Sequence, residues 1–409
     1  MNCKRILCVL FSMALLFSLF GCNVDQGGES STCQTEAGAS VTGGENEESP
    51  SDEEHENYNT IKIGVLEPQN GPYAENGRLM LLGLRYANSK KPSVKVKGET
   101  CRIELVIESS FNSLSSLKKG AQKLIKSGVC AVIGPSGGAY QLSAVPLLEN
   151  AGVPMLTVTG SPLKLAEDYS NVFSLSKSDE YMGKRMANYI YKTLGLSDVY
   201  VLCMLGDDSS EEAAFFLSQQ LESLGGRALL KTFTSDTYDF SPYTVEAASK
   251  DALVVLAPLS FSRQIIFSAS SSGVGKIIAS NQWSSEKAAR DAAEANPELY
   301  LCTNLKYNET SQRAKAFMNW MGSDADLSEL SGGFIESGIA YGAVDAYNAL
   351  LAAIKAANSA DPAKIAAKLK TLELKGITGT VSFDSLGRRS SGAAFYIADK
   401  ASVSWKKLG

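Results

Sequence analysis

The 409-residue chain has one histidine, eight cysteines and a formal net charge of −5, and its length predicts two or three domains with cores of their own. The single histidine, His55, lies in a run of acidic residues, so a Ser-His-Asp hydrolase, a Cys-His protease or a His-ligated zinc site is excluded. No dense Lys/Arg run with interleaved aromatic residues occurs, so nucleic acid is not an expected partner.

The N-terminus has the pattern of an export signal. Lys4-Arg5 forms a short basic region, and Ile6 to Phe20 is an uncharged apolar stretch that is too short to span a bilayer comfortably. The stretch ends in Leu19-Phe20-Gly21-Cys22, which resembles the bacterial lipobox. This resemblance implies a signal peptide over residues 1–21 and a lipid on Cys22. The alternatives are an ordinary signal peptide that contains a cysteine, and an uncleaved anchor.

Residues 22–60 have the composition of a disordered tether. Residues 23–60 contain ten acids, no Lys or Arg, and almost no large apolar side chain. Such a segment buries too little surface to offset its ordering entropy. From residue 61 onward the chain has a slight excess of three positive charges, so we expect an acidic tether that carries a nearly neutral folded body.

The cysteines matter because an exported protein meets an oxidising compartment. Cys33 lies in the tether, and the spacing of the later cysteines matches no metal motif. We interpret the later cysteines as mostly free, buried thiols, with a Cys101–Cys130 disulfide as the alternative. The four cysteines of the folded body are Cys101, Cys130, Cys203 and Cys302.

From residue 61 the pattern alternates between strand and helix. Apolar residues at Leu79, Leu82 and Tyr86 have helical spacing, and Ser113 is placed to cap a second helix. Strands are predicted over 61–66, 103–108, 130–134 and 155–158, with a third helix over 139–150.

A second series of the same kind follows. It contains predicted strands over 200–205, 230–233, 252–256, 277–279 and 300–303, and a helix over 211–224. Helices over 311–320 and 332–358 and short strands over 380–383, 394–397 and 403–405 end the chain. This alternation predicts an α/β fold with two doubly wound parallel sheets, one for each half.

Ligands of such sheets bind where the loops at the carboxyl ends of the strands converge. Ser136-Gly137-Gly138 opens a helix, so its free N–H groups could receive a carboxylate, with Ser161 and the Thr159 backbone completing the hydrogen bonds. The alternative is a well-capped helix beside a solvated hydroxyl loop.

Other loops offer aromatic and acidic side chains. Tyr73, Phe261 and Trp283 could wall an apolar side chain of a ligand, although a lone aromatic residue is more often part of the core. Asp207-Asp208 could be a paired carboxylate site, but adjacent residues on an extended segment point to opposite faces. We therefore favour a solvated loop for this pair.

Several runs together resemble one known family. Ile61 to Leu66 with Asn70-Gly71-Pro72-Tyr73-Ala74 and Gly77 resembles the opening of type I periplasmic binding proteins of the branched-chain amino acid group. The runs 131–135, 151–154 and 376–384 also match, in family order.

The resemblance implies two lobes that are joined by three crossovers and close on a ligand. The crossovers fall near 175–179, 303–307 and Gly376. The N-terminal lobe then comprises 61–178 and 307–375, and the C-terminal lobe 179–306 and 376–409.

The family's ligand residues map onto this sequence with departures. The carboxylate-binding serine falls at Gly138, with the Ala139 backbone N–H beside it, and the second hydroxyl falls on Ser161. The acid that often pairs with the ligand ammonium becomes Asn281, and the usual Tyr-Gly becomes Glu211-Glu212. Asp179 matches a family aspartate, and with Glu211 it could take over ammonium recognition, the alternative being a structural role for both.

The resemblance implies a solute-binding lipoprotein that delivers an amino acid or related carboxylate or amide to ABC permease and ATPase subunits. We expect a monomer that meets the membrane only through its lipid, on the extracytoplasmic side. No nucleophile–base pair, metal set or cofactor motif emerges, so we expect neither an enzyme nor a cofactor. The alternative is an envelope lipoprotein that senses a ligand or partner with the same fold, marked by a cleft too filled for solute.

Overall fold

The computed structural model describes residues 59–109, 113–303, 312–323, 337–390 and 392–408. The predicted signal peptide and tether, with Cys22, Cys33 and His55, lie outside the described residues. Part of the predicted second crossover, 304–307, and the predicted helix start at 332–336 also lie outside them.

The first lobe is built on a six-stranded sheet with the order β2-β3-β1-β4-β5-β6. All its strands are parallel except β2, which pairs antiparallel with β3 at the edge. Ile63 of β1 lies opposite Leu105 of β3, and both neighbours of β1 are reached by crossovers, as a doubly wound sheet requires. The strands are β1 (Thr60–Leu66), β2 (Ser93–Val96), β3 (Glu99–Glu108), β4 (Val132–Ile133), β5 (Met155–Thr157) and β6 (Val172–Ser174).

Helices cover this sheet, and two of them make a very close contact. A Cβ added at Gly83 of α1 would lie 2.3 Å from the Ala340 carbonyl oxygen of α12, so only glycine allows the two helices to approach this closely. The predicted cap of α2 is confirmed, since the Ser113 side chain accepts from the Ser116 N–H. The helices are α1 (Ala74–Lys90), α2 (Leu114–Lys126), α3 (Gly138–Asn150), α4 (Leu163–Glu167), α10 (Gln312–Met321), α12 (Gly338–Ala357) and α13 (Pro362–Leu369).

The second lobe is built on a seven-stranded sheet with the order β15-β14-β11-β10-β9-β7-β8. The tail strands β14 and β15 are antiparallel, and the remaining strands are parallel. The strands are β7 (Asp198–Met204), β8 (Arg227–Phe233), β9 (Ala252–Leu256), β10 (Lys276–Ala279), β11 (Glu298–Thr303), β14 (Ala394–Asp399) and β15 (Ser404–Lys407).

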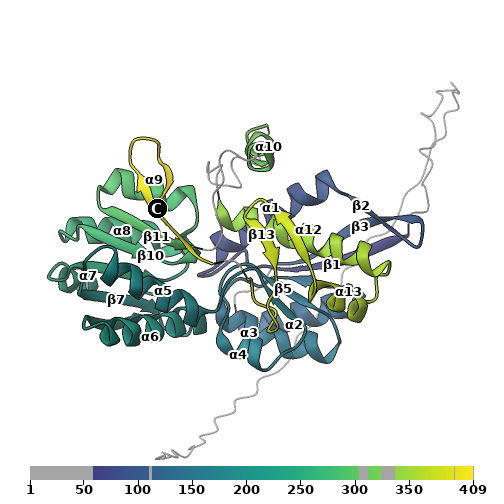
Figure 1. Cartoon of the computed structure of the whole chain (residues 1–409), viewed down its shortest axis with the longest axis horizontal. Helices are drawn as coiled ribbons and strands as arrows, with labels where there is room; N and C mark the ends of the chain where they lie inside the picture. Colours follow the sequence, from purple (N-terminus) through teal and green to yellow (C-terminus); the bar gives the residue numbers. More distant parts are fainter. Residues whose placement is uncertain (1–58, 110–112, 304–311, 324–336, 391, 409) are drawn as a thin grey trace, which may run out of the picture. The chain divides into compact units, whose positions relative to one another are not determined.

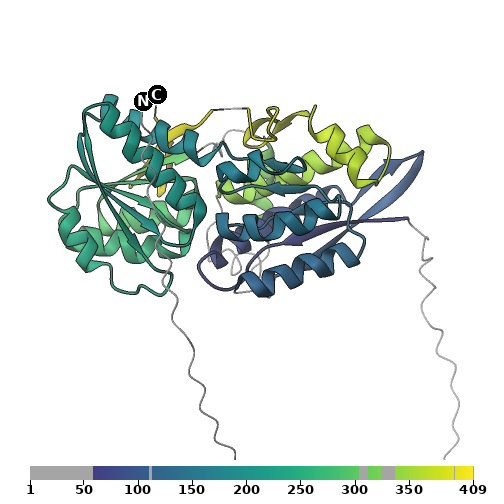
Figure 2. The ribbon, with the colours of Figure 1, turned by 90° about the horizontal axis from the view of Figure 1, so that it is seen from below.

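Helices lie on either side of each sheet (Figures 1 and 2). In the second lobe α5 packs tightly on α6, because a Cβ at Gly183 would lie 2.4 Å from the Ala213 carbonyl oxygen. The helical elements are α5 (Asp179–Lys192), α6 (Asp208–Ser223), α7 (Ser241–Ala247), α8 (Ser262–Ser271), α9 (Glu286–Ala295) and the short 3₁₀ turns η1 (Leu259–Phe261) and η2 (Asn281–Trp283).

The prediction of a two-lobed α/β fold with doubly wound sheets is therefore confirmed, while several of its details were wrong. The strand predicted over 130–134 is only Val132–Ile133, and the helix predicted to start at residue 211 starts at Asp208, because Asp207 caps it. The prediction missed β2, β6, α5 and β12 (Glu373–Gly376), whereas the strand predicted over 380–383 is β13 (Gly379–Ser382), which pairs antiparallel with β12. The exact lobe boundaries remain a prediction.

The chain segments near the predicted first and third crossovers are joined by buried charged groups. The Asp345 carboxylate of α12 accepts from the Ile377 and Thr378 N–H groups, both at 2.8 Å. The Arg389 guanidinium donates to the Thr378 carbonyl oxygen at 3.0 Å and to the Leu175 carbonyl oxygen at 3.4 Å. Both side chains are fully buried, so this cluster fixes how the two segments lie against each other.

The four cysteines of the described body are all free and buried. This confirms the interpretation as free thiols and excludes the alternative Cys101–Cys130 disulfide in this structure. Burial raises the pKa of the Cys130 and Cys203 thiols to about 12, so neither is a reactive thiolate at neutral pH.

Candidate functional site

The candidate site consists of loops that follow strands of both sheets. In doubly wound folds, ligands bind at this carboxyl end of the strands. Hydrogen bonds join the loops of one lobe to those of the other. The loops span residues 67–73, 134–138 and 158–162 in the first lobe and 205–208, 257–261 and 280–285 in the second.

The start of α6 in the second lobe lies directly on the glycine-containing loops of the first. The Gly138 N–H donates to Asp207 Oδ1 at 3.0 Å. A Cβ at Gly138 would lie 2.6 Å from the Ser209 nitrogen, and a Cβ at Gly160 would lie 2.5 Å from Ser209 Oγ. The protein's own carboxylate thus occupies the helix N-terminus where the sequence predicts a ligand carboxylate.

Asp207 is fully buried and satisfied without a cation. Its Oδ2 accepts from the Ser210 N–H at 3.3 Å and from Gln282 Nε2 at 3.2 Å. Asp208 is exposed, so the adjacent pair does point to opposite faces. The solvated-loop interpretation was right for Asp208 and wrong for Asp207, because Asp207 accepts from the Gly138 N–H of the other lobe and from Ser210 and Gln282 of its own.

The predicted hydroxyl Ser161 lies beside Asp179. The Ser161 N–H donates to Asp179 Oδ2 at 3.0 Å, and the Asp179 N–H donates back to the Ser161 carbonyl oxygen at 3.1 Å. Ser161 Oγ is buried and has no hydrogen-bond partner among the described residues. Burial raises the pKa of Asp179 well above its ordinary value, and the negative charges of Glu212 and Asp207 raise it further.

Glu212, rather than Glu211, is the acid of α6 that reaches the first lobe. Its two carboxylate oxygens accept from the Leu163 N–H at 3.1 and 2.9 Å. Glu211 turns back to its own loop, where Oε1 accepts from the Gly206 N–H at 2.7 Å. Burial raises the pKa of Glu212. Asp179 and Glu212 thus form an acidic pair of the second lobe that accepts from the Ser161 and Leu163 N–H groups of the first.

Two further residues that the sequence predicts to bind a ligand carboxylate are Ala139, in the first turn of α3, and Thr159, in the loop after β5. Ala139 follows Gly138 in the first turn of α3 and is half-buried. The Thr159 carbonyl oxygen accepts from Gln141 Nε2 at 2.7 Å. The backbone groups predicted to hold a ligand are therefore close together, and most of them already have a partner within the protein.

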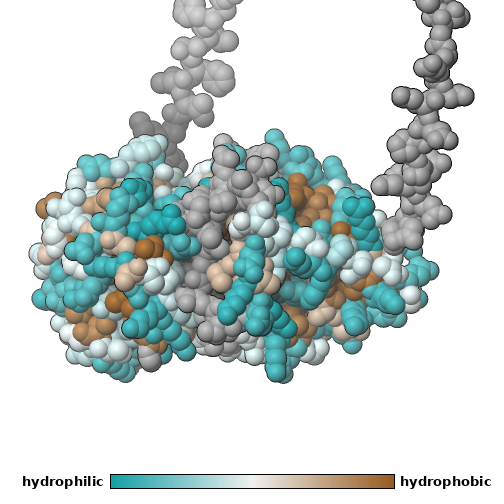
Figure 3. Space-filling model, turned by 90° about the horizontal axis from the view of Figure 1, so that it is seen from above, coloured by the Kyte–Doolittle hydropathy of each residue, from teal (hydrophilic) through white to brown (hydrophobic). Residues whose placement is uncertain are grey.

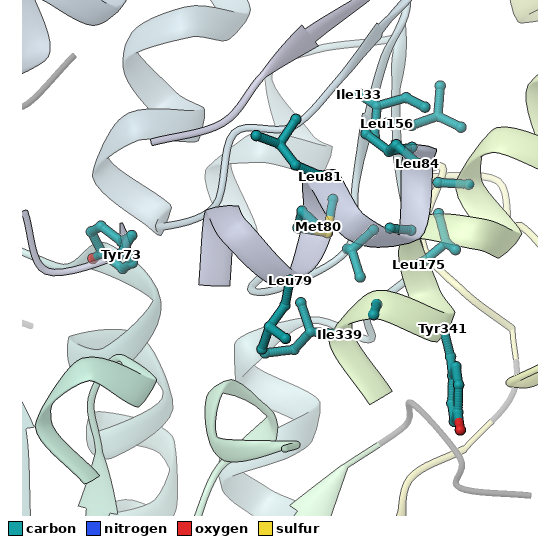
Figure 4. Close-up of a cluster of buried hydrophobic side chains, with 14 of the residues drawn as sticks. Tyr73, Leu79, Met80, Leu81, Leu84, Ile133, Leu156, Leu175, Ile339 and Tyr341 are labelled. Carbon is teal, nitrogen blue, oxygen red and sulfur yellow. The ribbon is translucent and has the colours of Figure 1, made fainter. Parts of the chain in front are cut away.

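The three predicted aromatic residues have different surroundings. The Tyr73 ring lies against Gly137, where a Cβ would be 2.6 Å from Tyr73 Cζ, and Figure 4 shows it apart from the main aliphatic cluster. Phe261 packs in the second lobe, with its ring 5.1 Å from that of Phe233. Trp283 is fully buried, and its Nε1 has no partner among the described residues. Phe261 thus has the core role given as the alternative for a lone aromatic residue.

Asn281, at the position where relatives often carry an acid, joins two predicted crossovers. Its Nδ2 donates to Ser176 Oγ at 3.2 Å, and its Oδ1 accepts from the Thr303 hydroxyl. Ser176 follows β6, and Thr303 ends β11. Because Ser176 Oγ donates to the Val158 carbonyl oxygen at 2.6 Å, it needs a donor here, which the Asn281 amide supplies and a carboxylate would not.

Sequence reasoning missed two polar residues of this region. Asn76 of α1 accepts from the Leu259 N–H at 3.3 Å and donates to the Gln282 carbonyl oxygen at 3.4 Å. Glu67 is fully buried and accepts from the Ser136 N–H at 3.1 Å, and its burial raises its pKa to about 8. A polar residue directly after a buried strand was the available signal for Glu67, whereas Asn76 sits inside a helix and gave none.

Little space is left between these loops. The cavity there has a volume of about 30 Å³, and Gly160, Asp179, Ser209 and Asn281 are among its lining residues. A cavity must have a volume of about 10–15 Å³ to hold a water molecule, so this one has room for one or two waters. This conformation does not accommodate an amino acid.

The described residues contain neither a metal-binding cluster nor a membrane-spanning helix. No group of three or more His, Cys, Asp or Glu side chains in this part of the chain could hold a metal ion. No helix among the described residues is both long and apolar enough to cross a membrane.

Two α/β lobes with ligand-type loops at facing strand ends define the architecture of bilobal binding proteins. The chain belongs to the periplasmic binding protein family, whose model matches residues 60–401. The resemblance seen in the sequence is thereby confirmed. No curated protein sequence matches the chain.

Solved structures agree with this assignment. A leucine-binding protein, LivK, from Thermotoga maritima is 26% identical with a TM-score of 0.73, covering 86% of this chain and 98% of its own. LivJ from Streptococcus pneumoniae, solved with isoleucine, is 22% identical with a TM-score of 0.69, covering 85% and 99%. A solute-binding protein from R. palustris, solved with benzoate, is 16% identical with a TM-score of 0.75, covering 86% and 96%. At 22% and 16% identity, the likeness to LivJ and to the R. palustris protein shows only that this chain has the same fold.

Proposed function

We propose that this protein is an extracytoplasmic solute-binding lipoprotein that captures a small polar ligand between its lobes and delivers it to an ABC importer. The ligand is an amino acid or a related carboxylate or amide. The observation that carries the proposal is the hydrogen bond from the Gly138 N–H to the Asp207 carboxylate. A helix N-terminus that receives a carboxylate from the opposite lobe is suited to receive one from a ligand.

Ligand capture requires the lobes to separate first, since the present cavity is too small. Separation breaks the contact of Asp207 with Gly138 and that of Glu212 with Leu163. The ligand carboxylate then takes the Gly138 N–H, and closure brings α6 back over it. The family membership and the LivK likeness support this hinge mechanism.

Unpaired buried groups support the same site. Ser161 Oγ and Trp283 Nε1 have no partner among the described residues, and a buried polar group without a partner costs about 1–3 kcal/mol. A polar ligand would supply the missing partners. Asp179 and Glu212 would face the ligand ammonium, a cation that also lowers their raised pKa values.

A ligand panel read by thermal unfolding tests the proposal. Amino acids, amides, organic acids and sugars are added singly, and a ligand at about one hundred times its Kd stabilises the folded state by roughly 2.7 kcal/mol. We expect at least one carboxylate or amide to raise the midpoint. If no compound raises it, solute capture is contradicted.

The lipid anchor is tested separately. Cys22→Ala removes the thiol that would be acylated, so the protein is expected to move from the membrane fraction to the soluble extracytoplasmic fraction. Cys33→Ala, in the same predicted tether, is the matched control and should stay with the membrane. Membrane retention of Cys22→Ala would contradict lipidation at this residue.

One observation favours a second function. The small cavity between the loops is what we expect of an envelope lipoprotein that senses a ligand or partner without transport. In that case the panel gives no stabilisation. Permease and ATPase genes beside this one would favour import over sensing.

A further inference from the structure

A second cavity in the first lobe lies away from the loops of the candidate site. Its volume is about 280 Å³, against about 30 Å³ for the space between those loops. It is bordered by the end of α1, by α10 and α12, and by β12 with the residue that follows it. The proposed solute capture makes no use of it.

The inner wall of this cavity is apolar. The Tyr86 ring and the Val344 and Ile377 side chains line it, and each is less than a tenth exposed. The Tyr86 ring is held by edge contact with Phe317 at 5.0 Å and by Trp320 at 5.3 Å. A ring or short alkyl chain would bury apolar surface against this wall.

The rim of the cavity is basic. Lys90, Lys91, Arg313 and Lys375 line it and are exposed, and none of the four forms an ion pair with a carboxylate of the described residues. Lys91 Nζ donates to Asn348 Oδ1 at 2.7 Å, and Arg313 donates to the Lys375 carbonyl oxygen. Burial lowers the pKa of Lys91, and the nearby positive charge of Arg313 lowers it further.

The one acid of the lining does not neutralise this rim. Asp345 is fully buried, and its oxygens accept from the Ile377 N–H and from the Thr378 N–H and hydroxyl. Asp345 therefore binds the segment that follows β12, Ile377 and Thr378, rather than the lysines. Ile377 belongs to that segment, so an occupant of the cavity would contact it.

We propose that this cavity, called here the basic pocket (Tyr86, Lys90, Lys91, Arg313, Val344, Lys375 and Ile377), binds a small amphiphilic anion. The ligand class is a single carboxylate, sulfonate or phosphate group on an aromatic or short aliphatic body. Four cations that form no ion pair among the described residues complement the anionic group, with Lys90 Nζ 5.7 Å from the centre of the Tyr86 ring, and the apolar wall complements the body.

The exposed apolar residues elsewhere on the described chain lie outside this pocket. Figure 3 shows brown patches scattered among hydrophilic residues on the face in view. The strongly exposed apolar residues of the described chain, such as Phe215 and Tyr238, do not line this cavity, so a probe bound there can be told apart from one bound elsewhere.

The test uses 8-anilinonaphthalene-1-sulfonate with the full-length protein at low salt. Lys90→Glu/Lys375→Glu changes two rim cations whose side chains make no hydrogen bond among the described residues, so folding is retained. We expect saturable binding whose Kd rises at least about tenfold in this variant, and which weakens with added salt. Lys118→Glu/Lys119→Glu, an exposed pair on α2, has the same charge change and should alter the Kd less than about twofold.

Two further readouts locate the probe. N-phenyl-1-naphthylamine, which lacks the sulfonate, should bind wild type more weakly and should not distinguish the variants. Probe emission excited through tryptophan should fall in Trp320→Phe, because Trp320 packs against Tyr86 of the pocket. Unchanged sulfonate affinity in Lys90→Glu/Lys375→Glu, or unchanged sensitised emission in Trp320→Phe, would overturn the proposal.

Discussion

Two regions of this protein bury carboxylates, and they satisfy them differently. Next to β12, the Thr378 hydroxyl donates to the Asp345 carboxylate and accepts from the guanidinium of the fully buried Arg389. At the candidate site, Asp207 and Asp179 are held by N–H and O–H donors, with no cation among their hydrogen-bond partners. A buried charge with a compensating cation is suited to permanent structure, whereas acids held by amides can exchange those amides for a ligand.

The largest expected effect is on the region with the cation. Arg389→Met leaves the Thr378 and Leu175 carbonyl oxygens and the Asp345 carboxylate without their buried cation, so stability should fall by about 3–5 kcal/mol. Urea unfolding followed by circular dichroism measures this loss.

The neighbouring arginine is the matched control. Arg388 forms a partly exposed ion pair with Asp384 at 3.3 Å, so Arg388→Met should cost less than about 1 kcal/mol. Equal losses in the two variants would remove the contrast between the two regions.

The next effect is a pH dependence that arises at the candidate site. Burial raises the pKa of Glu67 from 4.5 to about 8, so the folded protein retains a proton that the unfolded chain has lost. Stability due to this group should therefore fall as the pH rises from about 4.5 to about 8, by on the order of a few kcal/mol.

Glu67→Gln should flatten this slope, because the amide does not ionise. Chemical denaturation at several pH values between 4.5 and 8 measures it. Glu104→Gln, at an exposed position of β3, should leave the slope as in wild type. A slope that survives in Glu67→Gln would assign the pH dependence to other groups.

A smaller effect concerns ligand binding. The buried Ser161 hydroxyl has no partner among the described residues, so Ser161→Ala should not destabilise the unliganded protein and should stabilise it by up to about 1–3 kcal/mol. Binding of the solute found in the panel should weaken by about 1–3 kcal/mol, because the ligand loses a buried donor. Isothermal titration calorimetry measures the affinity, and equal affinity would exclude Ser161 from the site.

Much of the fold was predictable because its signals are local. Alternating apolar runs gave the central strands, and Ser113 predicted the start of α2. The edge strand β2 was missed, since a four-residue hairpin arm has a weak pattern. The alternation predicted the two sheets, and the family runs predicted the crossovers by which the chain returns to each lobe, which periodicity alone did not establish.

The candidate site was predictable only in part. Gly138, Ser161 and Asp179 lie together as the strand-end rule implies. The burial of Asp207 and the exchange of roles between Glu211 and Glu212 were not predictable, because each depends on which face of α6 meets the other lobe. The bonds of Asn76 likewise join residues 183 positions or more apart in the sequence.

The most direct test removes the carboxylate that occupies Gly138. Asp207→Ala also removes the cap of α6, so Asp361→Ala, which removes the cap of α13, is the control for that loss. If Asp207 and the solute compete for the Gly138 N–H, calorimetry should show solute binding about tenfold tighter in Asp207→Ala and unchanged in Asp361→Ala. Affinity that is unchanged or weaker in Asp207→Ala would contradict the account.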